Sequence, residues 1–330
     1  MIGAPVVSVI LPSYNHARFV RAAVISVLAQ SLTALELIVV DDGSTDGTAD
    51  VVASIHDPAL RLVRLPRNRV VQPRNLALAQ ARGEFIAFQN SDDVWCPAKL
   101  ERQVAAMRAE PGMSLCFTAT RIIGADGLAA PGTWAEGVFT TRNRPRLDWL
   151  RHFFDSGNCL AIASAMVRRA QLEALGGFRG SLVQLGDFDL WLRLAAIGDI
   201  TILPEILCDV RVYAGVNYSA PSPASARRSH IELAEVLGRY TEAPLLDAMP
   251  AIFPELEAFV TPGARKVALA LRAWPRGGGC ALFAERTIAS VMDDAGQRAD
   301  AVHAHGPDFI HRFIAQRGGA DVLPPGAVRA

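Results

Sequence analysis

Three short polar clusters carry side chains that could do chemistry, and each one follows an apolar run. They are Ser13-Tyr14-Asn15, Asp41-Asp42 and Asn90-Ser91-Asp92-Asp93. Gly43 follows the second cluster, so a carboxylate there is presented where the chain can turn sharply. Carboxylate and amide oxygens are the ligands that hard divalent cations such as Mg²⁺ and Mn²⁺ prefer. A further acid, Asp187, stands at the start of a helix-like pattern.

The elements that must position these clusters alternate along the first hundred residues. Short apolar runs predict strands at 6–11, 35–40, 61–65 and 84–88, and helical spacing predicts helices at 19–28, 50–55, 72–81 and from Pro97 onward. This alternation predicts an α/β fold with a mostly parallel sheet covered by helices. Ligands of such sheets bind beyond the carboxyl ends of the strands. The three polar clusters all fall at those ends and therefore predict one site.

The remainder of the chain is less regular. Strands are predicted at 114–123 and 161–167, with a Gly/Pro-rich stretch at 124–146 between them, and the segment 187–197 predicts a helix. Proline and serine cluster at 221–223, and the pattern beyond is Ala/Leu/Arg-rich and helical. We therefore expect a domain at 1–220 and a helical C-terminal extension at 221–330.

Composition limits the function classes. Lys plus Arg and Asp plus Glu number 33 each in 330 residues, so no global charge attracts nucleic acid or an anionic membrane. Five scattered cysteines without a CxxC pair suit reduced thiols in a cytosol. The first residues lack signal-peptide features, and no run of about 18 apolar residues predicts a membrane span. We expect a cytoplasmic protein, and the oligomeric state is left open.

Basic residues in the extension offer two interpretations of its surface. They lie among apolar residues at Arg265, Lys266, Arg272, Arg276 and Arg286. They could contact the inner face of an anionic membrane, or form an ordinary helix surface. We favour the ordinary surface.

Five segments in order resemble family 2 glycosyltransferases of the GT-A fold. They are Val7 to Asn15, Leu37 to Asp46, Phe85 to Trp95, Gly176-Gly177-Phe178 and Gly186 to Arg193. The resemblance covers roughly residues 5 to 220. It implies a Rossmann-like sheet whose nucleotide-binding half is 1–110 and whose acceptor-facing half is 111–220.

The resemblance also implies how a nucleotide would be held. In the family the acidic turn binds the base and ribose, which assigns that role to Asp41 or Asp42, while Pro12 and Tyr14 would help to wall the base pocket. The alternative is that the turn from Asp42 onward only caps the next helix.

Two arginines are implied to contact the donor diphosphate. Arg74 corresponds to a family arginine near the diphosphate, where the guanidinium fork suits phosphate oxygens. Its alternative is a surface charge at a helix start, which the helix dipole disfavours. Arg211 lies in a segment similar to the one that closes the family's donor site and could assist.

The resemblance implies a metal site at the third cluster, which corresponds to the family's DxD-type motif. Asp92 is the expected ligand of Mn²⁺ or Mg²⁺, and such a cation neutralises charge on the departing diphosphate. Asn90 and Ser91 would contact the donor. Asn90 replaces the common Asp, so its amide oxygen brings no charge. The alternative is an acidic turn without a metal.

Asp187 resembles the family's catalytic base, which takes the proton of the attacking hydroxyl. It could instead be a helix N-cap. Asp189 competes for the role, but its spacing to Arg193 favours an ion pair on the helix surface. The family's frequent Glu is Gly186 here, and Tyr213 stands where many members carry histidine; a phenol is a poor ligand, so Tyr213 is not expected to bind metal.

The chain is therefore expected to be an inverting glycosyltransferase. It would move a sugar from a nucleotide-diphosphate donor, with UDP the favoured nucleotide, to a glycan or lipid-linked acceptor in cell-surface polysaccharide or lipopolysaccharide synthesis. A dehydrogenase or P-loop enzyme would carry GxGxxG or GxxxxGK[ST], and neither occurs. The alternative from another class is a catalytically silent nucleotide-sugar-binding scaffold.

Overall fold

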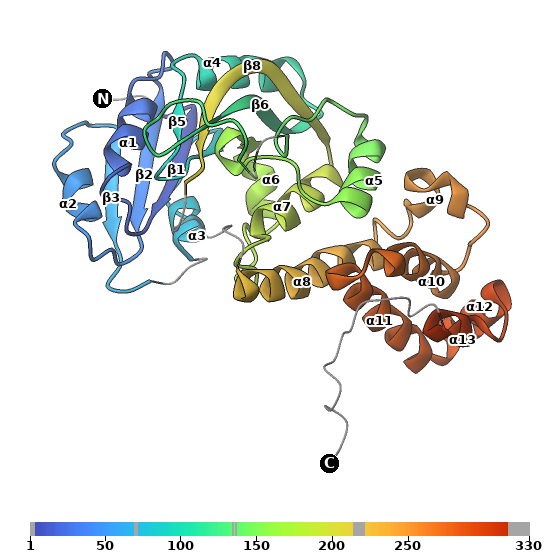
Figure 1. Ribbon diagram of the computed structural model, residues 1–330. Helices are drawn as coiled ribbons and strands as arrows, with labels where there is room; N and C mark the ends of the chain where they lie inside the picture. Colours follow the sequence, from blue (N-terminus) through green and yellow to red (C-terminus); the bar gives the residue numbers. More distant parts are fainter. Residues whose placement is uncertain (1–3, 69–71, 134, 136, 214–221, 316–330) are drawn as a thin grey trace. The chain divides into compact units, whose positions relative to one another are not determined.

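The computed structural model describes residues 4–68, 72–133, 135, 137–213 and 222–315. The chain divides into two compact units, 1–220 and 221–330 (Figure 1). The first unit holds one eight-stranded sheet in the order β3-β2-β1-β4-β7-β6-β8-β5. Its strands are β1 (Val7–Ser13), β2 (Leu35–Asp41), β3 (Leu60–Arg64), β4 (Phe85–Phe88), β5 (Val94–Trp95), β6 (Met113–Ile123), β7 (Met166–Arg168) and β8 (Asp199–Arg211).

Strands β1 to β4 form a parallel block that matches the predicted alternation. β1 pairs with β2 on one side and β4 on the other, and β2 pairs with β3. The chain order reverses at β1, so the crevice beyond the carboxyl ends of β1 and β4 is a topological switch point, where ligands of such sheets bind. The predicted strand was to end before Pro12, but β1 runs through Pro12 to Ser13 opposite Asp41.

The second half of the sheet departs from a purely parallel arrangement. β7 runs antiparallel between β4 and β6, β5 runs antiparallel beside β8, and β6 and β8 are parallel over nearly their whole length. The strand predicted at 161–167 is wrong in extent, because residues 162–164 form a 3-10 turn and only 166–168 pair. The long strand β8 was not predicted, since polar residues and Pro204 interrupt its apolar run.

Helices cover both faces of the sheet. They are α1 (Val20–Leu28), α2 (Thr48–Ala53), α3 (Gln72–Leu78), α4 (Lys99–Ala109), α5 (Arg146–Ser156), α6 (Arg169–Ala174) and α7 (Gly186–Ala195). Side chains alternate along a strand. Val7, Val9 and Leu11 of β1 pack in one cluster with α1, α2 and α4. On the other face, α3 contacts β1 and β2, while the Phe88 ring contacts Trp191 of α7.

The second unit is helical, as expected for the extension. Its helices are α8 (Pro223–Leu237), α9 (Met249–Ile252), α10 (Pro262–Ala273), α11 (Gly278–Asp293), α12 (Ala295–His305) and α13 (Phe309–Ala315). Val267, Trp274, Ile288 and Phe313 belong to its buried cluster. Ser222 caps α8 by accepting from Ser225 N at 3.0 Å. The predicted boundary at 220 falls in residues 214–221, which lie outside the described residues.

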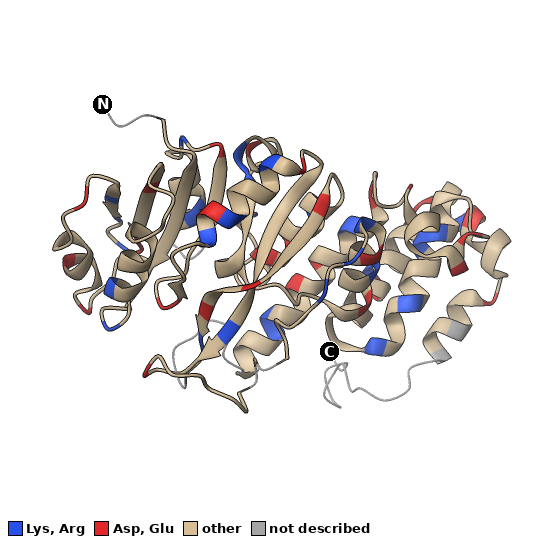
Figure 2. Cartoon of the chain, turned by 90° about the horizontal axis from the view of Figure 1, so that it is seen from above, with Lys and Arg blue, Asp and Glu red and all other residues tan. Residues whose placement is uncertain are grey.

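Four of the five basic residues that raised the question of membrane contact have hydrogen-bond partners within the second unit. Arg265 donates to main-chain carbonyls, Lys266 to Gln297, Arg272 to Glu255 and Arg286 to Glu235. Acidic and basic residues are interspersed within each unit (Figure 2). No helix in the described part of the chain is long and apolar enough to span a bilayer.

Candidate active site

The turns that follow β1 and β2 are hydrogen-bonded to each other at the carboxyl edge of the sheet. Asn15 N donates to Ser44 Oγ at 2.9 Å, and Thr45 N donates to Asn15 Oδ1 at 2.8 Å. Asn15 has φ 51°, in the left-handed region that few non-glycine residues adopt. Gly43 has φ 77°, and a Cβ there would meet the Arg67 backbone at 2.7 Å, so this turn requires glycine. The two turns form one rigid rim.

Asp41 and Asp42 are both buried at this rim, but they are held differently. Asp41 accepts from Ser44 N at 3.0 Å and from Ser44 Oγ at 2.6 Å. Its carboxylate therefore closes the turn, and contact with a nucleotide would use its remaining lone pairs. Asp42 N donates to Ser13 O at 2.8 Å. Pro12 and Tyr14, the expected pocket walls, lie half-buried beside them.

The acidic turn after β4 presents one carboxylate and anchors the other. Asp93 accepts from Asn90 Nδ2 at 2.8 Å and from Arg211 N at 2.7 Å, and is 2% exposed. Burial and the charge of Asp92 raise the pKa of Asp93 to about 8. Burial also raises the pKa of Asp92, against the opposing charges of His16 and Arg211. Asp93 thus fixes the turn. The Asp92 carboxyl is hydrogen-bonded by the Tyr213 hydroxyl instead of by the backbone of β8, and we refer to Asp92 as the presented acid.

Arg211 is a clamp on this turn. Its Nε donates to Asp92 O at 2.8 Å, and one terminal nitrogen donates to Gly124 O at 2.6 Å. Its guanidinium lies over the Phe19 ring, 4.8 Å from the centroid. The residue expected to assist the diphosphate therefore ties β8 to the acidic turn through its own side chain.

His16 joins the acidic turn to β1, and sequence reasoning did not single it out. Its Nδ1 lies 2.6 Å from Ser91 Oγ, and its Nε2 lies 3.3 Å from the Tyr213 hydroxyl. Burial, and then the charge of Asp92, raise the pKa of Tyr213 to about 12, so the phenol stays protonated at neutral pH. The position of His16, directly after Ser13-Tyr14-Asn15, was the available signal.

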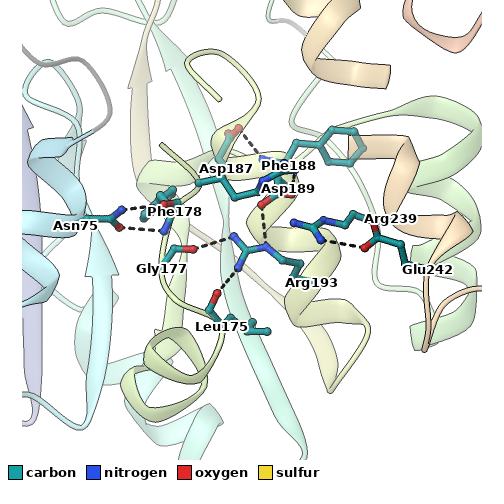
Figure 3. Close-up of polar contacts among 11 residues, drawn as sticks. Asn75, Leu175, Gly177, Phe178, Asp187, Phe188, Asp189, Arg193, Arg239 and Glu242 are labelled. Atoms are coloured by element: carbon teal, nitrogen blue, oxygen red, sulfur yellow. Dashed lines mark hydrogen bonds and ion pairs between the residues drawn. The ribbon is translucent and has the colours of Figure 1, made fainter. Parts of the chain in front are cut away.

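A second group of polar residues connects α3 to α7 through the turn at Gly176-Gly177-Phe178 (Figure 3). Asn75 Nδ2 donates to Phe178 O at 2.8 Å, and Phe178 N donates to Asn75 Oδ1 at 3.0 Å. Gly177 has φ 70°, and a Cβ there would meet Asn75 Oδ1 at 2.6 Å. The guanidinium of Arg74 lies over the Phe178 ring, 5.6 Å from the centroid. This turn therefore positions Arg74.

The same turn is bonded to α7 by Arg193. Arg193 donates to Leu175 O at 2.9 Å and to Gly177 O at 2.8 Å, and its Nε lies 2.8 Å from Asp189 Oδ2 (Figure 3). Arg179 approaches the other Asp189 oxygen at 3.4 Å. Asp189 is 0% exposed. The predicted Asp189–Arg193 ion pair forms, but its placement on the helix surface is wrong, because the pair is buried and holds the turn against α7.

Asp187 lies in the first turn of α7, with donors to each oxygen. Phe188 N donates to Oδ1 at 2.7 Å, and Asn158 Nδ2 donates to Oδ2 at 3.2 Å. Burial raises the pKa of Asp187, while Phe188 N, the charge of Arg74 and Asn158 oppose the increase. The N-cap interpretation is wrong, because α7 begins at Gly186 and its N-cap position is Leu185. Asn158 lies in a loop that gave no sequence signal.

Phe88 links the two groups of polar residues. Its ring contacts Phe178 at 5.4 Å and Trp191 at 6.2 Å, measured between centroids, and Asn90 follows two residues later. Trp191 is fully buried and also packs against Phe117, so it belongs to the core. Within the described ranges, no three His, Cys, Asp or Glu side chains gather as a metal cluster.

Comparison with known proteins identifies the domain. The family model for glycosyl transferase family 2 matches residues 8–168. TuaG of Bacillus subtilis, a putative teichuronic acid biosynthesis glycosyltransferase, is 41% identical over 126 residues, covering 37% of this chain and 50% of that protein. Chondroitin synthase of Pasteurella multocida is 27% identical over 230 residues, covering 68% of this chain. The chain spans about a fifth to a half of the length of these relatives, 22% of the synthase being covered.

Solved structures agree on the fold. S. aureus TarS 1–349, solved in complex with UDP-GlcNAc, has a TM-score of 0.56 at 20% identity, with 87% of this chain and 91% of that chain covered. The mannosyltransferase PcManGT from Pyrobaculum calidifontis, solved with GDP-Man and Mn²⁺, has a TM-score of 0.56 at 21% identity, with 94% and 86% covered. With its ordered motifs and its mostly parallel sheet, the chain contains a glycosyl transferase family 2 domain, which the family model matches at residues 8–168.

Proposed function

We propose that this chain transfers a glycosyl unit from a nucleotide-diphosphate donor, preferably a UDP-sugar, to an acceptor hydroxyl with inversion at the anomeric carbon. The observation that carries the proposal is that two carboxylates, Asp92 beyond β4 and Asp187 at the start of α7, each have a neighbouring acid that anchors their segment. TarS in complex with UDP-GlcNAc and TuaG in teichuronic acid biosynthesis support a UDP-sugar and a cell-surface polysaccharide.

The donor would lie across the switch point between β1 and β4. Pro12, Tyr14, Asp41 and Asp42 would border the nucleotide, with Asn90 and Ser91 on the opposite side of the crevice. Arg74 would contact the diphosphate, because a fixed guanidinium suits phosphate oxygens. Arg211 would act through the acidic turn that it clamps.

The carboxylate of Asp92 is a suitable ligand for a divalent cation. Burial disfavours the ionised form of Asp92, and a cation would relieve that cost. One protein carboxylate is enough for a cation that takes its other oxygens from phosphates and water. When bound, Mn²⁺ or Mg²⁺ neutralises charge that develops on the leaving diphosphate. The PcManGT structure, which contains Mn²⁺ with GDP-Man, supports this assignment.

Asp187 would accept the proton of the acceptor hydroxyl as that oxygen attacks the anomeric carbon. Each of its oxygens already accepts one hydrogen bond and keeps a lone pair for the substrate. The charge of Arg74 favours the ionised base, which is the form that can take a proton.

Calorimetric titration of UDP, GDP, CDP and dTDP, with and without Mn²⁺, tests the donor and metal assignments. We expect metal-dependent binding of UDP, weakened about tenfold or more in Asp92→Ala. Asp50→Ala is the matched control, since its carboxylate is 79% exposed and only meets Arg64. Binding of no nucleotide under any condition would overturn the proposal, whereas binding without any transfer would favour the silent scaffold.

A further inference from the structure

The loop that follows α5 brings Asn158 into contact with Asp187, the candidate base on α7. Helix α5 ends at Ser156, and Gly157 turns the chain so that Asn158 faces α7. The ring of Phe153 in α5 contacts the ring of Phe188 in α7 at 5.5 Å between centroids, with an interplanar angle of 78°. This packing fixes the loop relative to the helix that carries Asp187.

The Asn158 side chain is oriented by its own backbone. Leu160 N donates to Asn158 Oδ1 at 3.0 Å. The amide group is planar, so fixing the oxygen also fixes the direction of Nδ2, which donates to Asp187 Oδ2 at 3.2 Å. An Asn side chain can make both bonds, because it accepts through one atom and donates through the other.

The two oxygens of Asp187 therefore take donors from different elements. Phe188 N, on α7, donates to Oδ1, and Asn158, on the loop, donates to Oδ2. A carboxylate held at both oxygens cannot rotate freely, so its remaining lone pairs keep a fixed direction. Arg74 is the charged group that faces Asp187 from α3.

We propose that Asn158 is a positioning residue for glycosyl transfer, which aims the Asp187 carboxylate at the acceptor hydroxyl and stabilises its ionised form. The inference rests on the proposed function of Asp187. Asn158 is neutral at every pH, so its donation persists wherever Asp187 is ionised. A carboxylate aimed in advance avoids the reorientation that would otherwise be needed in the transition state.

Asn158→Asp separates positioning from local structure. An aspartate at 158 still accepts from Leu160 N, but it cannot donate to Asp187 and places a like charge beside it. We expect kcat for transfer to fall about 10- to 100-fold, with donor KM and calorimetric donor affinity nearly unchanged. The Asp187 titration, followed by ¹³C NMR of labelled aspartate carboxyls and assigned with Asp187→Asn, shifts to higher pH. Asn158→Ala shifts it in the same direction.

Asn143→Asp is the matched control. Asn143 also bridges backbone groups, donating to Ile202 O at 2.9 Å and accepting from Ile202 N at 2.6 Å. We expect it to leave the Asp187 titration unchanged. An unshifted titration with wild-type kcat in Asn158→Asp would overturn the positioning role alone. Wild-type turnover in Asp187→Asn would instead overturn the assigned base, and the NMR titration would still report whether Asn158 acts on that carboxyl.

Discussion

The acidic turn at 90–93 and the first turn of α7 each carry two aspartates, and each region divides the roles between them. In the acidic turn, Asp93 is bonded to Asn90 and to the backbone of Arg211, and Asp92 is presented. In α7, Asp189 is bonded to Arg193 and Arg179, and Asp187 is presented. The two anchoring acids have different partners. Asp93 accepts from a side-chain amide and a backbone N–H, whereas Asp189 forms ion pairs with two guanidinium groups.

This difference matters for the expected effects of substitution. Removing one partner of a buried ion pair leaves an uncompensated charge, whereas removing a carboxyl held by neutral donors costs less. Burial raises the pKa of both presented acids and also that of the anchor Asp93, so the roles are separated by the contacts of each carboxyl and not by its pKa. The anchoring acids should therefore govern stability, and the presented acids should govern activity.

The largest effect should come from Asp187→Asn. We expect transfer to fall about 10²- to 10⁴-fold because the proposed general base is lost, while donor binding and the free energy of unfolding do not fall. Rates of nucleotide release and calorimetric donor titration measure the two quantities. Asp148→Asn, an exposed acid in the first turn of α5, is the control and should leave both unchanged.

Asp189→Asn should lower the free energy of unfolding by about 3–5 kcal/mol, since Arg193 and Arg179 lose a buried counter-charge. Denaturant unfolding measures this change. Arg169–Glu173 has the same spacing at the surface, with a Glu173 side chain that is 46% exposed. Glu173→Gln should change stability by no more than about 0.5 kcal/mol. Equal losses in the two variants would remove the distinction between anchoring and surface acids.

Gly177→Ala should destabilise the turn that joins α3 to α7 by more than Gly176→Ala. Both positions have positive φ, which costs a residue with a side chain about 1–2 kcal/mol. Only at 177 would the new Cβ also displace Asn75, because nothing lies within 4 Å at 176. Thermal unfolding of both variants gives the difference, and identical losses would show that the Asn75 contact is dispensable.

The smallest effect concerns pH. Because burial raises the pKa of Asp187, transfer should decline with falling pH at a midpoint above 3.8, the ordinary value for aspartate. The decline follows protonation, since a neutral carboxyl cannot accept the proton of the acceptor. Loss of the opposing charge in Arg74→Gln should move the midpoint higher. A kcat–pH profile of both proteins measures it, and a midpoint that moves lower would contradict the proposed pairing of Arg74 with Asp187.

Much of the first half could be predicted because its strands are short and separated by helical repeats, and because β1, β2 and β4 are buried on both faces. The runs 35–40 and 84–88 form β2 and β4 almost as expected. The second half was harder to predict. β8 has mixed burial and so lacks a regular apolar pattern, and α5 follows a Gly/Pro-rich stretch that gives no helix signal. Motif resemblance proposes Asp92 and Asp187 as the metal ligand and the base. It offers no role for Asn158, because the role proposed for that residue depends on where a loop lies and not on local pattern.

The pairing of β6 with β8 has a consequence for the time at which the site forms. Ser114, at the start of β6, donates through its hydroxyl to Asp199 O, 85 positions along the chain. Closing so long a loop is slow, and parallel strands form only after the intervening segment has collapsed. That segment contains α7 and Asp187. We therefore expect residues 1–110 to assemble first during folding and the proposed base to reach its place last, so that a partly folded chain would not activate an acceptor.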